Sequence, residues 1–148
     1  MRRAETKEPL RADCPVALAS VRAPSTWSSY REAAASSHGV GLGYVLAEGD
    51  GIVCIDLDHC IDASGRLAPW ARRLLERCPT TFVEVSPGGR GLHIWGRGEL
   101  TRGRKIRRAD GAHIEVYGQG RYIAMSGRRY GDAPQTLADL SEVVASLT

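Results

Sequence analysis

The sequence predicts an α+β fold in which a mostly antiparallel or mixed sheet, built from hairpins, has helices packed on it. Three observations lead to this class. Short strand-like runs recur between glycine-containing turns, three segments carry helix signals, and strands follow strands instead of alternating regularly with helices. The 148 residues, 43% hydrophobic and 25% charged, suffice for the core of one globular domain.

The first helix is predicted at residues 25–37. Ser29 and Glu32 have the spacing of a capping box, in which the two residues satisfy each other's backbone N–H groups. Residues 1–24 contain three prolines and show no clear period, so we expect an extended N-terminal arm, followed by a folded domain at 25–148. The apolar stripe of the helix would consist of Trp27, Tyr30 and Ala34.

Two further helices are predicted at residues 66–77 and 136–147. Pro69 suits the first turn of the earlier helix and Pro79 ends it, while Thr136 would cap the later one. The buried faces would be formed by Trp70, Ala71, Leu74 and Leu75, and by Leu137, Leu140, Val143 or Val144, and Leu147.

Three hairpins are predicted from pairs of strand-like runs separated by short turns rich in glycine. Each pair joins segments that are close neighbours in the sequence. The predicted pairs are 41–47 with 51–58, 81–86 with 92–96, and 113–117 with 121–126.

The strand candidate at residues 51–60, GIVCIDLDHC, ends in two carboxylates. Because side chains alternate along a strand, Cys54, Asp56 and Asp58 would share one face. Like charges this close need a cation, and hard oxygen ligands suit Mg²⁺ or Mn²⁺. A solvated acidic turn is the more common origin of such a pattern, so metal binding depends on matching residues elsewhere. The opposite, core-facing side would carry Val53, Ile55 and Leu57.

The turn at residues 86–93, SPGGRGLH, combines three glycines with hydroxyl, guanidinium and imidazole groups. Glycines let backbone N–H groups approach an anion closely, so the turn could surround a triphosphate. A plain glycine-rich hairpin turn is the alternative. The candidate phosphate-binding residues are Ser86, Gly89, Arg90, Gly91 and His93.

A third candidate group lies in the strand at residues 113–117. Glu115 alternates with apolar neighbours and shares its face with Tyr117, and a hairpin partner, Arg121, would project from the same face. Glu115 is therefore a candidate third metal carboxylate, and Arg121 a candidate phosphate or template contact. A surface Glu–Arg pair of little energetic value explains the same residues equally well.

Basic residues concentrate at 101–111, TRGRKIRRADG, in a chain of net charge +3. We expect a mobile loop there, which would either clamp a nucleic-acid backbone or only be solvated. Trp95, on the face of His93, is the aromatic candidate for stacking on a base. The basic candidates are Arg102, Arg104, Lys105, Arg107 and Arg108.

The cysteines and the apolar segments bear on location. None of the four cysteines forms a CxxC pair, and we expect reduced thiols, not disulfides or a zinc site. No apolar run is long enough for a membrane span or signal peptide, so a cytoplasmic protein that does not interact with membranes is expected.

The ordered set of motifs resembles the primase–polymerase domain of phage and plasmid replication proteins, from the archaeo-eukaryotic primase superfamily. The resemblance runs from about Thr26 to Gly127 and rests on TWSSYREA, GIVCIDLDHC, EVSPGGRGLHIW and IEVYGQGRYIAMSG. It implies an RRM-like catalytic core with two metal-binding aspartates, a turn that holds the nucleotide phosphates, and a third carboxylate. These motifs fall on Asp56 and Asp58, on Ser86, Gly89, Gly91 and His93, and on Glu115.

The resemblance implies template-directed nucleotidyl transfer, as a DNA primase or DNA polymerase, by a two-metal mechanism in phage or plasmid replication. Its partners would be a DNA template or primer, nucleoside triphosphates, and a helicase or helical primase domain in the same or another chain. A metal-dependent nuclease and a non-catalytic nucleotide- or DNA-binding module remain the alternatives.

Three departures from the family are visible. Gly88 stands where serine is frequent, no upstream strand is evident in residues 1–24, and the helical and helicase segments that commonly follow are absent. We therefore expect either an excised catalytic domain or a stand-alone protein that works with a partner.

Overall fold

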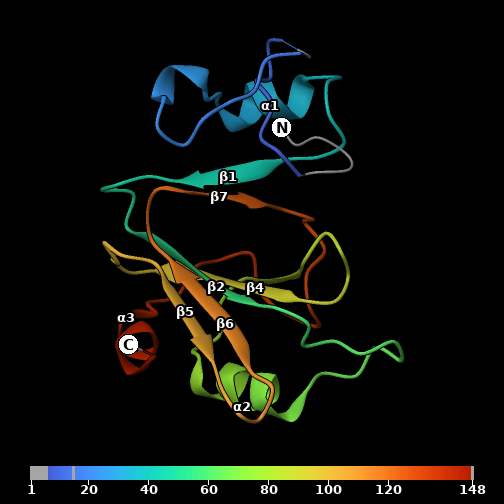
Figure 1. The fold of residues 1–148 in the computed structure, drawn as a ribbon, viewed down its shortest axis with the longest axis vertical. Coiled ribbons are helices and arrows are strands. Elements are labelled where there is room, and N and C mark those ends of the chain that lie inside the picture. Colours follow the sequence, from blue (N-terminus) through green and yellow to red (C-terminus); the bar gives the residue numbers. More distant parts are fainter. Residues whose placement is uncertain (1–6, 15, 148) are drawn as a thin grey trace.

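A five-stranded antiparallel sheet with the strand order β3-β4-β2-β6-β5 lies at the centre of the protein (Figure 1). The structure is a computed structural model that describes residues 7–14 and 16–147. The paired strands are antiparallel and helices pack on the sheet, which confirms the predicted α+β class. The strands are β2 (Ile52–Leu57), β3 (Val83–Val85), β4 (Leu92–Arg97), β5 (Arg104–Arg107) and β6 (His113–Tyr117).

Helices cover one face of this sheet, where the main core lies. The core-facing side chains predicted for β2, Val53, Ile55 and Leu57, are fully buried there. They pack with residues of α2 (Pro69–Arg77) and α3 (Ser141–Ser146). In Figure 1, α2 lies below the sheet and α3 to its left. The alternation of apolar and polar residues along β2 therefore separates a core face from a face available for chemistry.

The two helices differ in how closely they follow the prediction. Helix α2 begins at Pro69, where no N–H is needed, and buries the predicted Trp70, Ala71 and Leu74. Helix α3 does not begin at Thr136. Residues 136–140 are not helical, because their backbone groups bond instead to Phe82 and Arg97. The predicted apolar residues Leu140, Val143, Val144 and Leu147 are nevertheless buried in the main core.

One of the three predicted hairpins is confirmed and two are wrong. Strands β3 and β4 pair as predicted. In contrast, β1 (Gly43–Leu46) pairs with β7 (Arg121–Ala124), and β6 pairs with β2 and β5. The β1–β7 ribbon lies across the sheet face that the helices leave open (Figure 1). A second apolar cluster explains this pairing, because Leu46 and Ile123 of the ribbon pack there on side chains of the sheet.

The basic segment predicted as a mobile loop contains strand β5 at the edge of the sheet. Its pairing with β6 places Ile106 opposite Ile114, and Ile106 packs against the main core. Lys105 and Arg107 project from the opposite face, since side chains alternate along the strand. The exposed charges also discourage edge-to-edge association with another chain.

An N-terminal layer lies above the ribbon in Figure 1 and contains a 3₁₀ turn, η1 (Pro24–Thr26), and helix α1 (Tyr30–Ala35). The Ser29–Glu32 capping box is confirmed. The predicted apolar stripe is wrong, because Tyr30 is 80% exposed and α1 buries none of its residues. The capping box therefore stabilises the start of α1 without support from a buried face.

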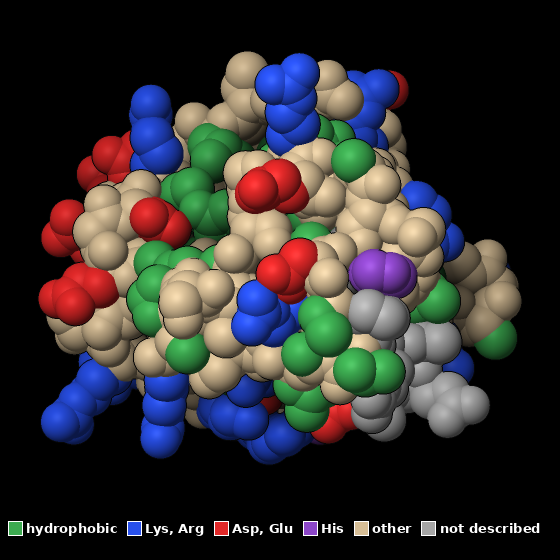
Figure 2. All heavy atoms as spheres, turned by 90° about the horizontal axis from the view of Figure 1, so that it is seen from above, with side chains coloured by type: hydrophobic (Ala, Val, Ile, Leu, Met, Phe, Trp, Pro, Cys, Tyr) green, Lys and Arg blue, Asp and Glu red, His purple; other side chains and the backbone are tan. Residues whose placement is uncertain are grey.

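The N-terminal arm predicted at residues 1–24 lies partly outside the described residues, namely at 1–6 and at Pro15. The remainder contains two isolated bridges, one of which pairs Leu10 with Leu18. Figure 2 views the molecule from this end and shows hydrophobic side chains in separate patches between charged ones. Among the described residues, no helix has the length and apolar character needed to cross a bilayer.

Candidate active site

A row of polar side chains crosses all five strands of the central sheet. Cross-strand pairing places Glu84 of β3 opposite His93 of β4, His93 opposite Asp56 of β2, Asp56 opposite Glu115 of β6, and Glu115 opposite Lys105 of β5. Directly paired residues in antiparallel strands project from the same face. The whole row therefore lies on the side of the sheet away from α2 and α3.

The carboxylates that the sequence singles out meet in this row. One carboxylate oxygen from each of Asp56, Asp58 and Glu115 lies within 4.8 Å of the other two. Asp58 follows the end of β2 and is held beside β6 by a 3.0 Å hydrogen bond from its backbone N–H to the carbonyl of His113. Three convergent carboxylates form a donor set that fits a hard divalent cation such as Mg²⁺ or Mn²⁺.

Electrostatics distinguish the carboxylates. Burial raises the pKa of Asp56 to about 6; the charge of His93 opposes this increase, while Asp58 and Glu115 add to it. Burial also acts to raise the pKa of Glu115, but hydrogen bonds from the hydroxyl of Tyr117 (2.6 Å) and the ammonium of Lys105 (3.0 Å) outweigh it, so this pKa is lowered. Of these two carboxylates, Asp56 is therefore the one whose ionisation is disfavoured, chiefly by burial.

Without metal, Asp56→Asn should stabilise the protein at neutral pH. A carboxyl whose pKa rises from 3.8 to about 6 on folding prefers to be protonated in the folded state. Its contribution to the free energy of unfolding is complete below pH 3.8 and is lost as the pH rises through about 6. Asparagine stays neutral throughout, so we expect a gain of about 1–3 kcal/mol in the free energy of unfolding near pH 7.5 and little gain near pH 4. Denaturant titrations at both pH values in the presence of a chelator measure the difference.

The exposed Asp132 provides the control, because Asp132→Asn removes one negative charge without touching the cluster. Equal effects of the two substitutions would show that net charge, and not the crowding at Asp56, sets the pH dependence.

His93 lies between two carboxylates and is 5% exposed. Its Nδ1 is 2.8 Å from Oε1 of Glu84, and its Nε2 is 3.7 Å from Oδ1 of Asp56. Glu84 was not among the residues predicted for the site. The confirmed β3–β4 hairpin carries the signal that could have identified it, because its register puts Glu84 opposite His93.

The glycine turn packs tightly against the end of β2. A Cβ on Gly91 would lie 2.7 Å from the carbonyl oxygen of Leu57, so only glycine allows this close approach. The Gly91 N–H donates to Oγ of Ser86 (3.1 Å) and the Gly89 N–H to the Ser86 carbonyl (2.9 Å). Two of the amides expected to bind an anion are thus engaged inside the turn.

Two arginines border this turn. Nε of Arg90 donates to the carbonyl of Ile61 (3.2 Å), which ties the turn to the loop after β2. Arg128 donates to the carbonyl of Ser86 (3.0 Å) and brings a second guanidinium to the turn. No pattern in the sequence assigns Arg128 to the site, because this residue lies far from the turn along the chain.

The remaining predicted residues divide into those near the carboxylates and those away from them. Arg121 lies 4.6 Å above the ring of Tyr117 and 3.8 Å from Glu115, although the predicted hairpin between β6 and β7 does not exist. Arg107 lies beside His113 on the same face of the sheet. The other basic residues of the segment, Arg102, Arg104 and Arg108, are exposed.

Trp95 does not provide a stacking platform for a base, which corrects the expectation from its position on the face of His93. It is 3% exposed because the β1–β7 ribbon covers this part of the face, and Tyr44 of β1 packs edge-on against its ring. The ribbon thus covers the apolar rows of the sheet, while Asp56 and Asp58 retain partial exposure.

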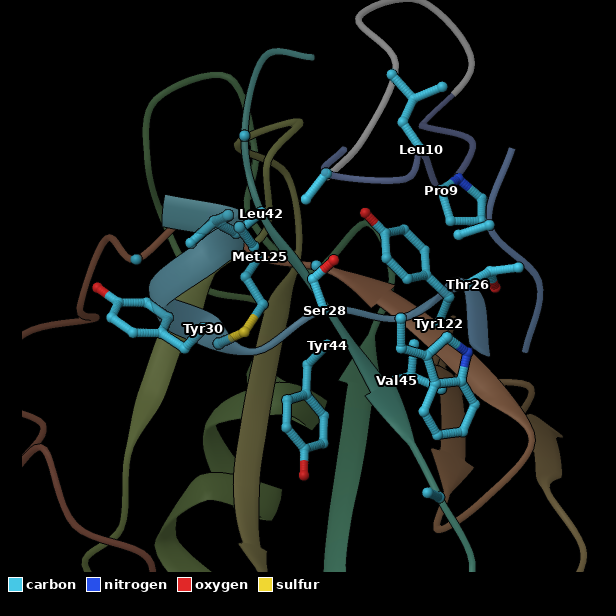
Figure 3. Close-up of a pocket in the computed structure, with 18 of the residues that line it drawn as sticks. Pro9, Leu10, Thr26, Ser28, Tyr30, Leu42, Tyr44, Val45, Tyr122 and Met125 are labelled. Carbon is cyan, nitrogen blue, oxygen red and sulfur yellow. The ribbon is translucent and has the colours of Figure 1, made fainter. Parts of the chain in front are cut away.

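A separate cavity of about 710 Å³ lies between the N-terminal layer and the ribbon (Figure 3). In Figure 3, Tyr30 of α1 and Tyr122 of β7 lie on its walls together with apolar side chains such as Leu42 and Met125. None of the three clustered carboxylates lines it. The cavity therefore offers apolar and aromatic surface and is distinct from the polar row.

Fold and site together define an α+β protein with a candidate divalent-metal centre beside a basic, glycine-rich turn. No protein-family model matches the chain. Over 110 residues, or 70% of the chain, it is 40% identical to the DNA primase-polymerase of Nitratiruptor phage NrS-1. This similarity confirms the resemblance found in the motifs and supports a primase–polymerase domain. The matched region makes up only 15% of the phage protein.

Proposed function

We propose that this chain catalyses template-directed nucleotidyl transfer to DNA, as a DNA primase or DNA polymerase in phage or plasmid replication. The observation that carries the proposal is the convergence of Asp56, Asp58 and Glu115 within 4.8 Å, next to His93, which is paired with Asp56. The similarity to the phage DNA primase-polymerase supports the same activity.

Asp56, Asp58 and Glu115 are the residues that would hold two Mg²⁺ or Mn²⁺ ions in a two-metal mechanism. Bound there, such ions would favour deprotonation of a primer 3′-hydroxyl and neutralise charge on the α-phosphate and the leaving pyrophosphate. Tyr117 fixes the rotamer of Glu115 through its 2.6 Å hydrogen bond. Lys105 compensates the charge of Glu115 in the metal-free protein.

The glycine turn and its surroundings would orient the incoming nucleoside triphosphate. Because Nδ1 of His93 lies on the Glu84 carboxylate, Nε2 donates to phosphate when both ring nitrogens are protonated. The Ser86 hydroxyl and the guanidinium of Arg90 supply further donors. Gly91 allows the turn to lie close to β2, and Gly89 adopts a φ of +79°, in the left-handed region that favours glycine. Arg128 at the turn and Arg121 beside Glu115 add positive charge on both sides of the carboxylates.

The basic edge of the sheet would bind the template or primer backbone. Its candidate contacts are Arg102, Arg104, Lys105, Arg107 and Arg108, of which Lys105 and Arg107 share the face of the carboxylates. A helicase or helical primase domain, in this or another chain, would supply the remaining replication functions in the cytoplasm.

Incubation of the protein with a labelled primer–template, Mn²⁺ and nucleoside triphosphates tests the proposal directly. Primer extension that depends on the template supports nucleotidyl transfer. Shortening of the primer would instead assign the carboxylates to a metal-dependent nuclease, and a gel shift without either product would indicate a binding module.

His93→Ala should weaken nucleotide binding more than DNA binding. Losing one charge-assisted hydrogen bond to phosphate typically costs about 1.5–3 kcal/mol, so KM for the nucleotide should rise about 10–100-fold. DNA affinity, measured by fluorescence anisotropy, should change by less than about 2-fold, since the residue faces the carboxylates and not the basic edge.

His38→Ala, which alters the N-terminal layer only, serves as the control for nonspecific damage. A loss of nucleotide and DNA affinity in equal measure, or a fall in thermal stability alone, would assign His93 a structural role.

A further inference from the structure

Glu84 is a fully buried carboxylate on the short strand β3. Each of its oxygens has its own partners. Oε1 is 2.8 Å from Nδ1 of His93, and Oε2 accepts hydrogen bonds from the backbone N–H groups of Ser126 (3.1 Å) and Gly127 (2.8 Å). A buried carboxylate is costly unless such partners satisfy it, so its presence at this place in the row requires an explanation.

We propose that Glu84 is a positioning residue that fixes the orientation of the His93 ring so that Nε2 faces the carboxylate cluster. The inference rests on the proposed function, in which His93 contacts the nucleotide phosphates. It adds a residue that does not itself touch the nucleotide but acts through His93.

Geometry supports the assignment, because the two ring nitrogens have different surroundings. Nδ1 is held by Glu84, whereas Nε2 lies 3.7 Å from Asp56, too far for a strong hydrogen bond and thus free to bind a ligand. Rotating the ring by half a turn would place a carbon against the Glu84 oxygen and leave it without this partner. The edge of Trp95 packs against the ring as well.

Electrostatics act in the same direction. Burial alone would raise the pKa of Glu84, but the hydrogen bond from His93 and those from Gly127 and Ser126 outweigh it and lower the pKa. The carboxylate is therefore charged at neutral pH and accepts hydrogen bonds only. This fixes Nδ1 of His93 as a donor, in the same way that carboxylates hydrogen-bonded to metal-binding histidines fix the tautomer and orientation of those rings in other proteins.

Glu84→Gln tests the hydrogen bond to His93 without changing the packing at position 84, because the two side chains have nearly the same shape and differ in their donor and acceptor groups. The glutamine oxygen can satisfy either the two backbone N–H groups or Nδ1 of His93, but not both sides. Two backbone donors favour the oxygen on their side, so the amide NH₂ would face Nδ1 and convert it from a donor to an acceptor. The variant should therefore fold but change which ring nitrogen carries the proton.

The first test reads the ring directly by ¹⁵N NMR of histidine-labelled protein, with His93→Ala identifying the resonances. In the wild type, Nδ1 of His93 should carry a hydrogen-bonded proton, and in Glu84→Gln the Nδ1 and Nε2 signals should change towards the other tautomer. An unprotonated Nδ1 in the wild type, or identical ring signals in both proteins, would overturn the proposal. The wild-type measurement decides even if the variant does not fold.

The second test is a double-mutant cycle on KM for the nucleotide. In Glu84→Gln the neutral ring still presents an Nε2–H to phosphate but lacks the positive charge that the Glu84 carboxylate supports in the doubly protonated ring. Glu84→Gln should therefore raise KM about 10-fold in the wild-type background and by less than about 2-fold in the His93→Ala background, because the effect passes through the ring. Effects that multiply in the double variant would make Glu84 a structural residue. Glu76→Gln, on the exposed side of α2, is the matched control.

The two tests distinguish the inference from the proposed function. If His93→Ala leaves nucleotide affinity unchanged while the ring signals respond to Glu84→Gln, then Glu84 positions His93 and the phosphate role of His93 is wrong. If His93→Ala weakens nucleotide binding while the ring signals do not respond, then the phosphate role stands and Glu84 does not position the ring.

Discussion

Replacing Asp56 or Asp58 with alanine is expected to abolish nucleotide incorporation while leaving the fold intact. Each substitution removes one of three clustered oxygen ligands, and metal ions contribute several kcal/mol of transition-state stabilisation in reactions of this kind. We expect a loss of at least about 10³-fold in the rate of primer extension. The fold should persist because removing one carboxylate relieves repulsion in the metal-free cluster.

Thermal melts with and without Mn²⁺ complete this experiment. A ligand that binds only the folded state raises its stability, so Mn²⁺ should stabilise the wild type and Asp132→Ala but not the Asp56 or Asp58 variants. A double variant at Asp56 and Asp58 that still extends a primer at the wild-type rate would exclude the proposed metal site.

The second large effect is expected at the basic edge of the sheet. Simultaneous replacement of Arg102, Arg104, Arg107 and Arg108 by glutamine should weaken DNA binding and flatten its dependence on salt. Each lost phosphate contact reduces the slope of log affinity against log salt by about 0.7–0.9, so four contacts correspond to a change of about 3. Lys105 is left unchanged because it pairs with Glu115 at 3.0 Å.

The first and last residues of β5 refine this test. Arg107 and Arg104 are both exposed but project from opposite faces, and only Arg107 shares the face of the carboxylates. The single substitution Arg107→Gln should therefore lower the slope more than Arg104→Gln, with nucleotide affinity nearly unchanged in both. If the quadruple variant retains the wild-type slope, the segment does not contact DNA.

Local features of the fold could be predicted from sequence, whereas the choice of strand partners could not. The capping box at Ser29 and the β3–β4 hairpin depend on residues that are neighbours in the chain. The runs that form β1 and β7 also stand next to short turns, which predicted pairing with the adjacent strands β2 and β6. Instead, β1 and β7 pair with each other. Their partners are decided by burial of Leu46 and Ile123 on the sheet, and a short turn carries no information about that contact.

The same distinction applies to the site. Asp56 and Asp58 are two residues apart, so their shared face follows from strand geometry alone. Glu115 joins them through register between β2 and β6, which its apolar neighbours helped to anticipate. Glu84 was missed because a single carboxylate in a short strand has no distinctive pattern. Trp95 was misjudged because nothing in its own segment shows that β1 and β7 cover it.

The β1–β7 ribbon has a consequence for how the protein assembles. Gly43 pairs with Ala124, and all five strands of the central sheet lie between β1 and β7 in the sequence. Pairing of β1 with β7 therefore closes a long loop of the chain. Such non-local pairing makes a large entropic demand and slows folding. We therefore expect the β3–β4 hairpin to form early and the ribbon late. Partial opening of the ribbon would expose Trp95 and Cys54 to solvent while β2, β4 and β6 stay paired.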